Sequence, residues 1–138
     1  MHPSSKSQVG VEYMFILGFA TIITLPLLIV YYNYSADSTE AIAASQALSI
    51  ARKIVDSSES VYYLGKPSQT TLKFNFPENI IATNLSNKEV VIKIKTRKGL
   101  SDIIQVSSVN ISGSLPTSSG LHIITVQAQD NYVQISSN

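Results

Sequence analysis

The chain has 138 residues, a formal net charge of +1 at pH 7 and no cysteine. This length allows at most one soluble domain beside a membrane segment, and the lack of cysteine excludes a fold held by disulfide bonds. The balanced charge excludes the basic excess typical of nucleic-acid-binding domains, so we expect no nucleic-acid partner.

The first predicted element is an apolar helix. Residues 14–32 contain no charged side chain, and as a helix rising roughly 1.5 Å per residue they would reach about 28 Å, close to the hydrocarbon thickness of a bilayer. The run is longer than the apolar region of a secretory signal, and the bulky Tyr34 stands where a signal cleavage site needs a small residue. We therefore predict a membrane span.

Glu12 stands at the start of this apolar run, and Lys6 is the one charged side chain before it. A carboxylate at the edge of a membrane segment is costly, so it indicates a functional residue with a partner. The alternative is that Glu12 lies in the headgroup zone, where the dipole of the first helical turn favours an acid.

The residues around Glu12 resemble the class III signal peptide of archaeal type IV pilin-like proteins, which carries the motif Gln-x-Ser-x-Glu-Tyr. The matching residues are Gln8, Gly10, Glu12 and Tyr13, preceded by Lys6 and Ser7. The chain departs from the motif at Gly10, where the family has Ser, and at Ser7, where Gly or Ala is commoner. The resemblance covers about 30 of the 138 residues.

This resemblance implies that residues 1–7 are a leader, which a prepilin peptidase removes at the processing site Lys6-Ser7-Gln8 by cutting between Ser7 and Gln8. Glu12 would then be the fifth residue of the mature chain, where pilins carry their Glu. In the family's filaments its proposed partner is the amino terminus of a neighbouring subunit, here that of Gln8.

The resemblance thus implies an assembly site of Gln8, Glu12 and Tyr13. The helix of this family breaks when subunits pack into a filament, which makes Gly18 and Pro26 candidate hinge positions. A harmless kink at Pro26 is the alternative.

The helical pattern continues beyond residue 34. No Gly or Pro occurs in residues 36–64, whereas Gly65 and Pro67 mark a helix end. The apolar side chains that recur at helical spacing are Ala44, Leu48, Ala51, Val55 and Tyr62, widened by Ile50, Ile54 and Val61. A helix over residues 8–64 would be about 85 Å long, so residues 8–34 form the membrane and assembly segment and residues 35–66 its amphipathic continuation.

Residues 67–138 change to the period-two alternation of half-buried strands. The expected strands are 71–76, 90–95, 103–111, 121–129 and 132–136, with a hairpin turn at Asp130-Asn131. Short connections favour antiparallel pairing. Because about 70 residues of sheet would be marginally stable alone, we expect the Leu48, Ala51 and Val55 face of the helix to pack across it.

The predicted fold class is therefore α+β. It is a lollipop-like pilin architecture in which a long amino-terminal helix packs its second half on a small antiparallel β domain, residues 67–138. Whether that domain is one sheet or a small sandwich is left open by the sequence.

Residues with catalytic or metal-binding chemistry are sparse. Beyond the leader, His122 is the one histidine, with no cysteine or acidic cluster near it, so we expect no enzyme activity, metal or cofactor. The charge cluster Lys93, Lys95, Arg97 and Lys98 indicates a protected strand edge or solvated face; an anionic ligand is the alternative. Three sequons make Asn33, Asn84 and Asn110 candidate N-glycosylation sites.

From the resemblance we expect a non-enzymatic structural subunit of an archaeal type IV pilus-like surface filament that serves adhesion. Its expected partners are identical or related subunits, the prepilin peptidase and the pilus assembly machinery. Before assembly it would span the cell membrane once with its carboxyl terminus outside, since the basic leader favours the inside.

Three alternatives compete with this expectation. The first is a monomeric, membrane-anchored extracellular binding module, which would need neither the peptidase site nor Glu12. The second is an archaellin, disfavoured because residues 8–13 look more like the pilin motif. The third is a membrane-bound enzyme, disfavoured because the chain lacks a nucleophile and base constellation.

Overall fold

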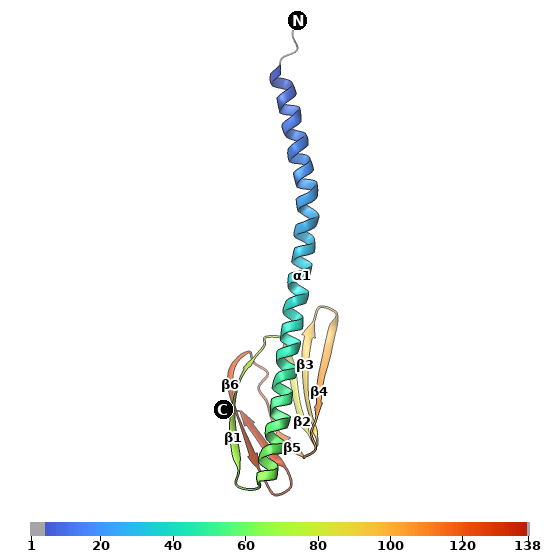
Figure 1. Ribbon diagram of the computed structural model, residues 1–138. Coiled ribbons are helices and arrows are strands. Elements are labelled where there is room, and N and C mark those ends of the chain that lie inside the picture. The colour runs from blue at the N-terminus through green and yellow to red at the C-terminus, as the bar shows by residue number, and fades with distance from the viewer. Residues whose placement is uncertain (1–4, 138) are drawn as a thin grey trace. The chain divides into compact units, whose positions relative to one another are not determined.

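The structure, a computed structural model, describes residues 5–137, with side chains from residue 9 onward. It contains one helix, α1 (Ser5–Leu64), followed by seven strands (Figure 1). The chain divides into two compact parts, the first ending at Thr39 and the second beginning at Glu40. Helix α1 begins three residues earlier than the expected start at Gln8 and contributes to both parts.

Helix α1 ends where the sequence predicts. The N–H of Gly65 donates to the carbonyl oxygens of Val61 and Tyr62, at 3.2 and 3.0 Å, and Gly65 has a φ of 79°. A left-handed residue at this position satisfies the last carbonyl groups of a helix, and glycine adopts that conformation without the steric cost of a Cβ. The chain then turns back and enters the first strand.

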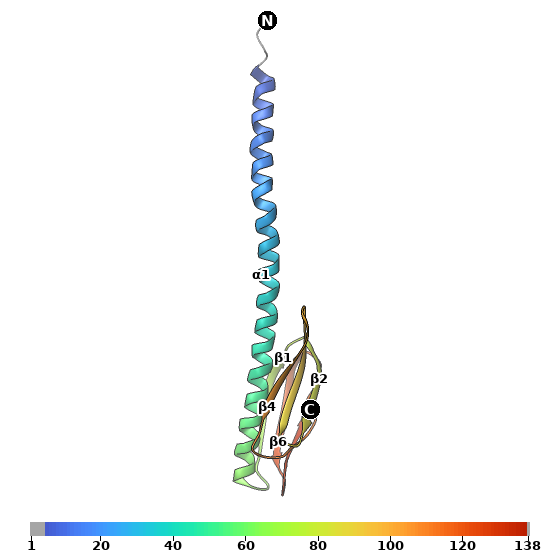
Figure 2. The same cartoon turned by 90° about the vertical axis from the view of Figure 1, so that its right-hand side faces the viewer.

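The strands of the second part form two sheets. They are β1 (Gln69–Phe76), β2 (Ile80–Ser86), β3 (Glu89–Thr96), β4 (Gly99–Val106), β5 (Ile111–Gly113), β6 (Gly120–Ala128) and β7 (Val133–Ser137). The first sheet has the order β1-β6-β7-β5, and the second has the order β2-β3-β4. In Figure 2 the strands lie on one side of residues 40–64 of α1.

One core joins this part of α1 to both sheets. Ala47, Ala51 and Ile54 of the helix are fully buried, and they share the core with side chains of both sheets such as Ile92 and Ile124. Alternate positions along each strand enter this core because side chains of a strand point to opposite faces. The expected α+β class, with a long helix packed on a β domain, is confirmed.

The packed face of the helix is rotated from the expected one. Ala51 and Val55 are buried as predicted, but Leu48 is only half-buried, and the fully buried positions include Ala47 and Ser58. The Ser58 hydroxyl donates to the carbonyl oxygen of Ile54 at 2.7 Å, which removes the cost of burying it. The sequence pattern favoured the larger Leu48, whereas the sheets approach the helix closely along its small residues.

The expected strand over residues 103–111 is wrong, because the structure breaks it into β4 and β5. Between them, Ser107 and Val109 turn inward and are buried, and the Val109 N–H donates to the Ser107 hydroxyl at 3.2 Å. The Ser108 N–H and hydroxyl both donate to Oε1 of Glu59, at 2.8 and 2.9 Å. These contacts end the alternation and move the chain from one sheet to the other.

Two further expectations about the sheets need correction. Strand β5 pairs with β7 in parallel, although the other strand pairs are antiparallel as expected. Residues 114–132 separate these two strands, so the rule for short connections does not apply to them. Strand β2 was not predicted, since a register shift between Ile80 and Ala82 breaks its alternation.

The hairpin between β6 and β7 is confirmed. These strands pair antiparallel, and the N–H of Gln129 donates to the carbonyl oxygen of Tyr132 at 2.8 Å across the turn at Asp130-Asn131. The sequence left open whether the β domain is one sheet or a sandwich, and the structure gives two sheets around one core.

Candidate functional site

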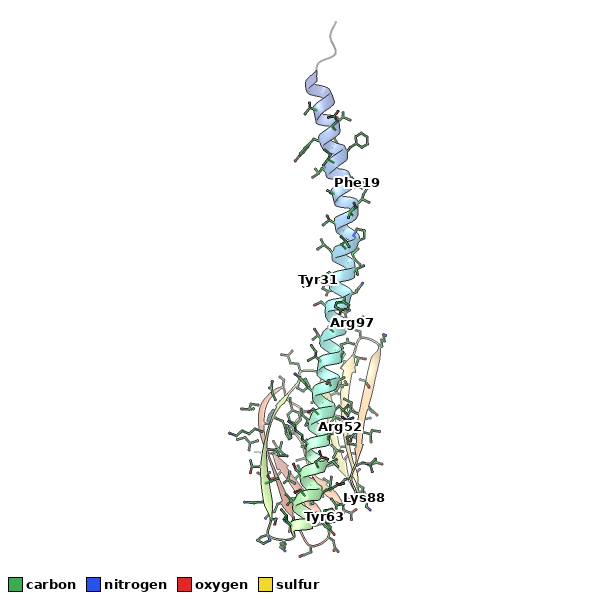
Figure 3. The ribbon with its side chains drawn as sticks, in the orientation of Figure 1. Phe19, Tyr31, Arg52, Tyr63, Lys88 and Arg97 are labelled. Atoms are coloured by element: carbon green, nitrogen blue, oxygen red, sulfur yellow. The ribbon has the colours of Figure 1, made fainter. Side chains whose placement is uncertain are left out.

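The amino-terminal half of α1 presents only exposed side chains. Every side chain from Val9 to Ser35 is exposed, and Phe15, Phe19 and Tyr31 keep 75%, 68% and 70% of their surface accessible. In Figure 3, Phe19 and Tyr31 extend from the helix into open space. By length and composition this helix is apolar enough to cross a membrane, and it is the one such helix among the described residues. Such a surface is stable in water only if something covers it.

Glu12 is the one charged side chain among residues 9–36. It and Tyr13 are exposed on the helix, and no ion pair within residues 9–137 involves Glu12. Covering this apolar surface also buries the carboxylate, and a buried carboxylate without a partner is costly. Whatever covers the surface must therefore supply a partner for the charge.

The expected processing site lies at the start of the same helix. The backbone of Lys6, Ser7 and Gln8 belongs to α1, which begins at Ser5. Residues 1–4 of the expected leader lie outside the described residues, as do the side chains of residues 5–8. Processing between Ser7 and Gln8 therefore stays a prediction.

The two candidate hinge positions lie inside the continuous helix. Pro26 cannot donate the backbone hydrogen bond that other residues donate to the preceding turn. An added Cβ at Gly18 would meet no atom within 4 Å, so the chain leaves open space around that turn. The hinge itself stays a prediction.

The contacts of His122 are those of a residue with a structural role. Its Nε2 lies 3.0 Å from the carbonyl oxygen of Ser118 and 3.2 Å from the Ser118 hydroxyl, and its ring meets the edge of Phe76 with centroids 5.5 Å apart. Within the part of the chain that the structure describes, no group of three His, Cys, Asp or Glu side chains could hold a metal ion. These contacts fix the loop before β6 on the core.

The cationic cluster on the β3–β4 hairpin is partly neutralised by acids. Lys93 lies 3.7 Å from Asp102, and Nε of Arg97 lies 3.9 Å from Glu40. Glu40 also accepts a hydrogen bond from the Arg97 N–H at 2.7 Å. The hairpin tip is thereby held against α1. Lys93 and Lys95 lie on β3, the central strand of its sheet, so the expected strand edge is wrong and the two lysines lie on a solvated face.

The structure also assigns roles to Glu40 and Glu59 that the sequence did not reveal. Each of these carboxylates accepts a backbone hydrogen bond from a loop of the β domain. The hydrogen bonds from Ser108 lower the pKa of Glu59 below its ordinary value. Only their spacing on the helix, flanking the buried stripe, could have indicated these contacts.

The three sequon asparagines are all exposed and lie in different elements. Asn33 is on α1, Asn84 is on β2, and Asn110 is in the loop that precedes β5. The structure does not bring them together into one site. Their glycosylation stays a prediction.

Comparison with protein-family models, with curated proteins and with solved structures finds no match for this chain.

Proposed function

We propose that this protein is a non-enzymatic structural subunit of a surface filament of the archaeal type IV pilus kind. The observation that carries the proposal is the uncovered apolar half of α1 with one carboxylate, Glu12, near its start. A lipid bilayer covers such a helix before assembly. After extraction from the membrane, identical helices packed side by side cover the same surface.

A polymer accounts for Glu12 better than a simple anchor does. In a bundle of helices this carboxylate is removed from water, and a buried charge left without its partner costs about 3–5 kcal/mol. Removal of residues 1–7 supplies the partner, because it exposes a positively charged amino terminus at Gln8. Cleavage then acts as the switch that permits assembly.

The compact second part suits an exposed position on such a filament. Its core is complete in the single chain, since the helix and both sheets share it. Adhesion is the proposed role of the assembled filament, and the peptidase and assembly machinery are its proposed partners.

The test is the amino-terminal sequence and intact mass of the protein from sheared filaments and, separately, from membranes. We expect filaments that begin at Gln8. Glu12→Ala and Glu12→Gln should be cut normally but be depleted from the filament fraction at least about hundredfold, the factor that corresponds to the loss of a buried partner. Asp37→Asn, at the next carboxylate along α1, is the matched control and should assemble normally.

A chain beginning at Met1 and found only in membranes would contradict the proposal and favour the monomeric anchored module. Normal filaments from both Glu12 variants would refute the role given to that carboxylate.

A further inference from the structure

Strand β4 exposes a row of apolar side chains on the outer surface of the second part. Leu100, Ile104 and Val106 keep 68%, 51% and 67% of their surface accessible. They occupy alternate positions, so they share the face of β4 that points away from the core. We call these three residues the β4 strip.

This strand is also a sheet edge. In its sheet β4 pairs only with β3, and the strand contains neither Lys nor Pro. Strand β1, at the edge of the other sheet, carries the exposed Lys73 and is flanked by Pro67 and Pro77. Lysines and prolines in particular protect edges from pairing with other chains, and β4 has only the carboxylate of Asp102 for this protection.

A second apolar group lies on the outer face of the other sheet. Leu121 and Ile123 of β6 keep 70% and 37% of their surface accessible. In the register of the sheet they stand opposite the exposed residues Asn75 and Lys73 of β1. We call Leu121 and Ile123 the β6 patch.

Charged side chains flank both apolar groups, and at the β4 strip they differ between its two ends, because Lys95 stands across from Leu100. Glu89 stands across from Val106 of the β4 strip, and Lys73 stands across from Ile123 of the β6 patch. Both are exposed, and neither takes part in an ion pair among the described residues. Asp102, which also lies on the outer face of β4, is by contrast paired with Lys93.

We propose that the β4 strip of one copy packs on the β6 patch of a second copy, with Glu89 facing Lys73. Apolar surface meets apolar surface, and the acid at the Val106 end of the strip complements Lys73 beside Ile123 of the patch. Because the two surfaces differ, the contact is head to tail and can be repeated without closing. The inference rests on the proposed function, in which copies stand side by side, and it deepens it by naming the contact between their β domains.

Cysteine cross-linking on whole filaments tests this contact, and the chain offers a clean background because it has no cysteine. A chain carrying both Val106→Cys and Ile123→Cys should, on mild oxidation, give a ladder of disulfide-linked oligomers. Chains carrying either substitution alone should stay monomeric. A dimer from Val106→Cys alone would show that the strip packs on itself, and this would overturn the proposal.

Charge reversal gives a second measurement. Glu89→Lys and Lys73→Glu should each reduce the yield of filaments about tenfold, because each places like charges in contact. The double variant should restore the yield. Asp56→Lys, at an exposed carboxylate of α1 outside the proposed contact, is the matched control and should leave the yield unchanged. No rescue by the double variant would contradict the proposal.

The cross-linking experiment, together with mass measurement, would also detect a glycan that covers the β4 strip. Asn84 lies on the same outer face, in register with Val91, which in turn faces Ile104. Filaments without a cross-linked ladder, together with a glycan mass on Asn84, would assign the strip to that glycan and refute the copy-to-copy contact. Absence of wild-type filaments would instead refute the proposed function, and with it this contact.

Discussion

Replacing Ile54 by Ala should destabilise the second part strongly. Ile54 is fully buried in the core that α1 shares with both sheets. Removing a buried Ile side chain down to Ala costs about 2–5 kcal/mol, and the cost rises with the cavity that remains. The nearby helix residues Ala47 and Ala51 have no side-chain length to fill that cavity, so we expect about 3–4 kcal/mol. For a unit of about 100 residues this corresponds to a fall in Tm of roughly 12 to 30 °C.

Calorimetry of the full chain in detergent measures this change. Ile42→Ala is the matched control, because Ile42 lies on the same helix but keeps 58% of its surface accessible. Both substitutions change helix propensity equally, so the difference in Tm isolates burial. The control should change stability by no more than about 0.5 kcal/mol. Equal shifts in Tm for the two variants would refute the argument that this core holds α1 to the sheets.

Two further substitutions test the contacts that bring the β domain together. Gly113→Ala should destabilise it by about 3 kcal/mol or more, because Gly113 has a φ of 133° and an added Cβ would collide with the backbone oxygen of Ile135. Gly99→Ala is the control for backbone strain, because Gly99 has a φ of 131° and an added Cβ there would meet no atom within 4 Å. Equal losses of stability for the two variants would contradict the argument. Glu59→Gln should reduce the loss of stability on acidification. The folded-state pKa of Glu59 is lowered, so the stabilisation by its carboxylate is present above the unfolded pKa near 4.5 and is lost as pH falls through the folded pKa. Tm measured from pH 6 to pH 3 checks this, and an unchanged pH dependence in the variant would contradict it.

The interactions of Glu40 and Glu59 show how the long helix is fixed to its β domain. Glu40 binds the β3–β4 hairpin tip, and Glu59 binds the loop between β4 and β5. Hydrogen bonds from backbone N–H groups to a carboxylate are stronger than those between neutral groups. The apolar core therefore supplies the packing energy, and the two carboxylates fix the position of the loops at either side.

Local patterns allowed the helix and most strands to be predicted. The uncharged run of residues 14–32, the helical spacing of Ala51 and Val55, and the Gly65 stop depend only on neighbours along the chain. The same is true of the turn at Asp130-Asn131, because a hairpin turn is specified by the residues that form it. The role proposed for Glu12 also rests on its local setting, since a single carboxylate beside an apolar run is unusual wherever it occurs.

Tertiary structure decided the features that depend on distant residues. The break between β4 and β5 depends on Glu59, which is far from Ser108 in sequence, and the parallel pairing of β5 with β7 depends on where β6 lies. The choice of Ala47 over Leu48 as the packed position reflects how closely the sheets approach the helix. The β4 strip and the β6 patch likewise lie on the outer faces only because the register of two separate sheets places their residues there. A sequence specifies its own periodicity, but close packing between elements selects the face that is buried and leaves the other face for partners.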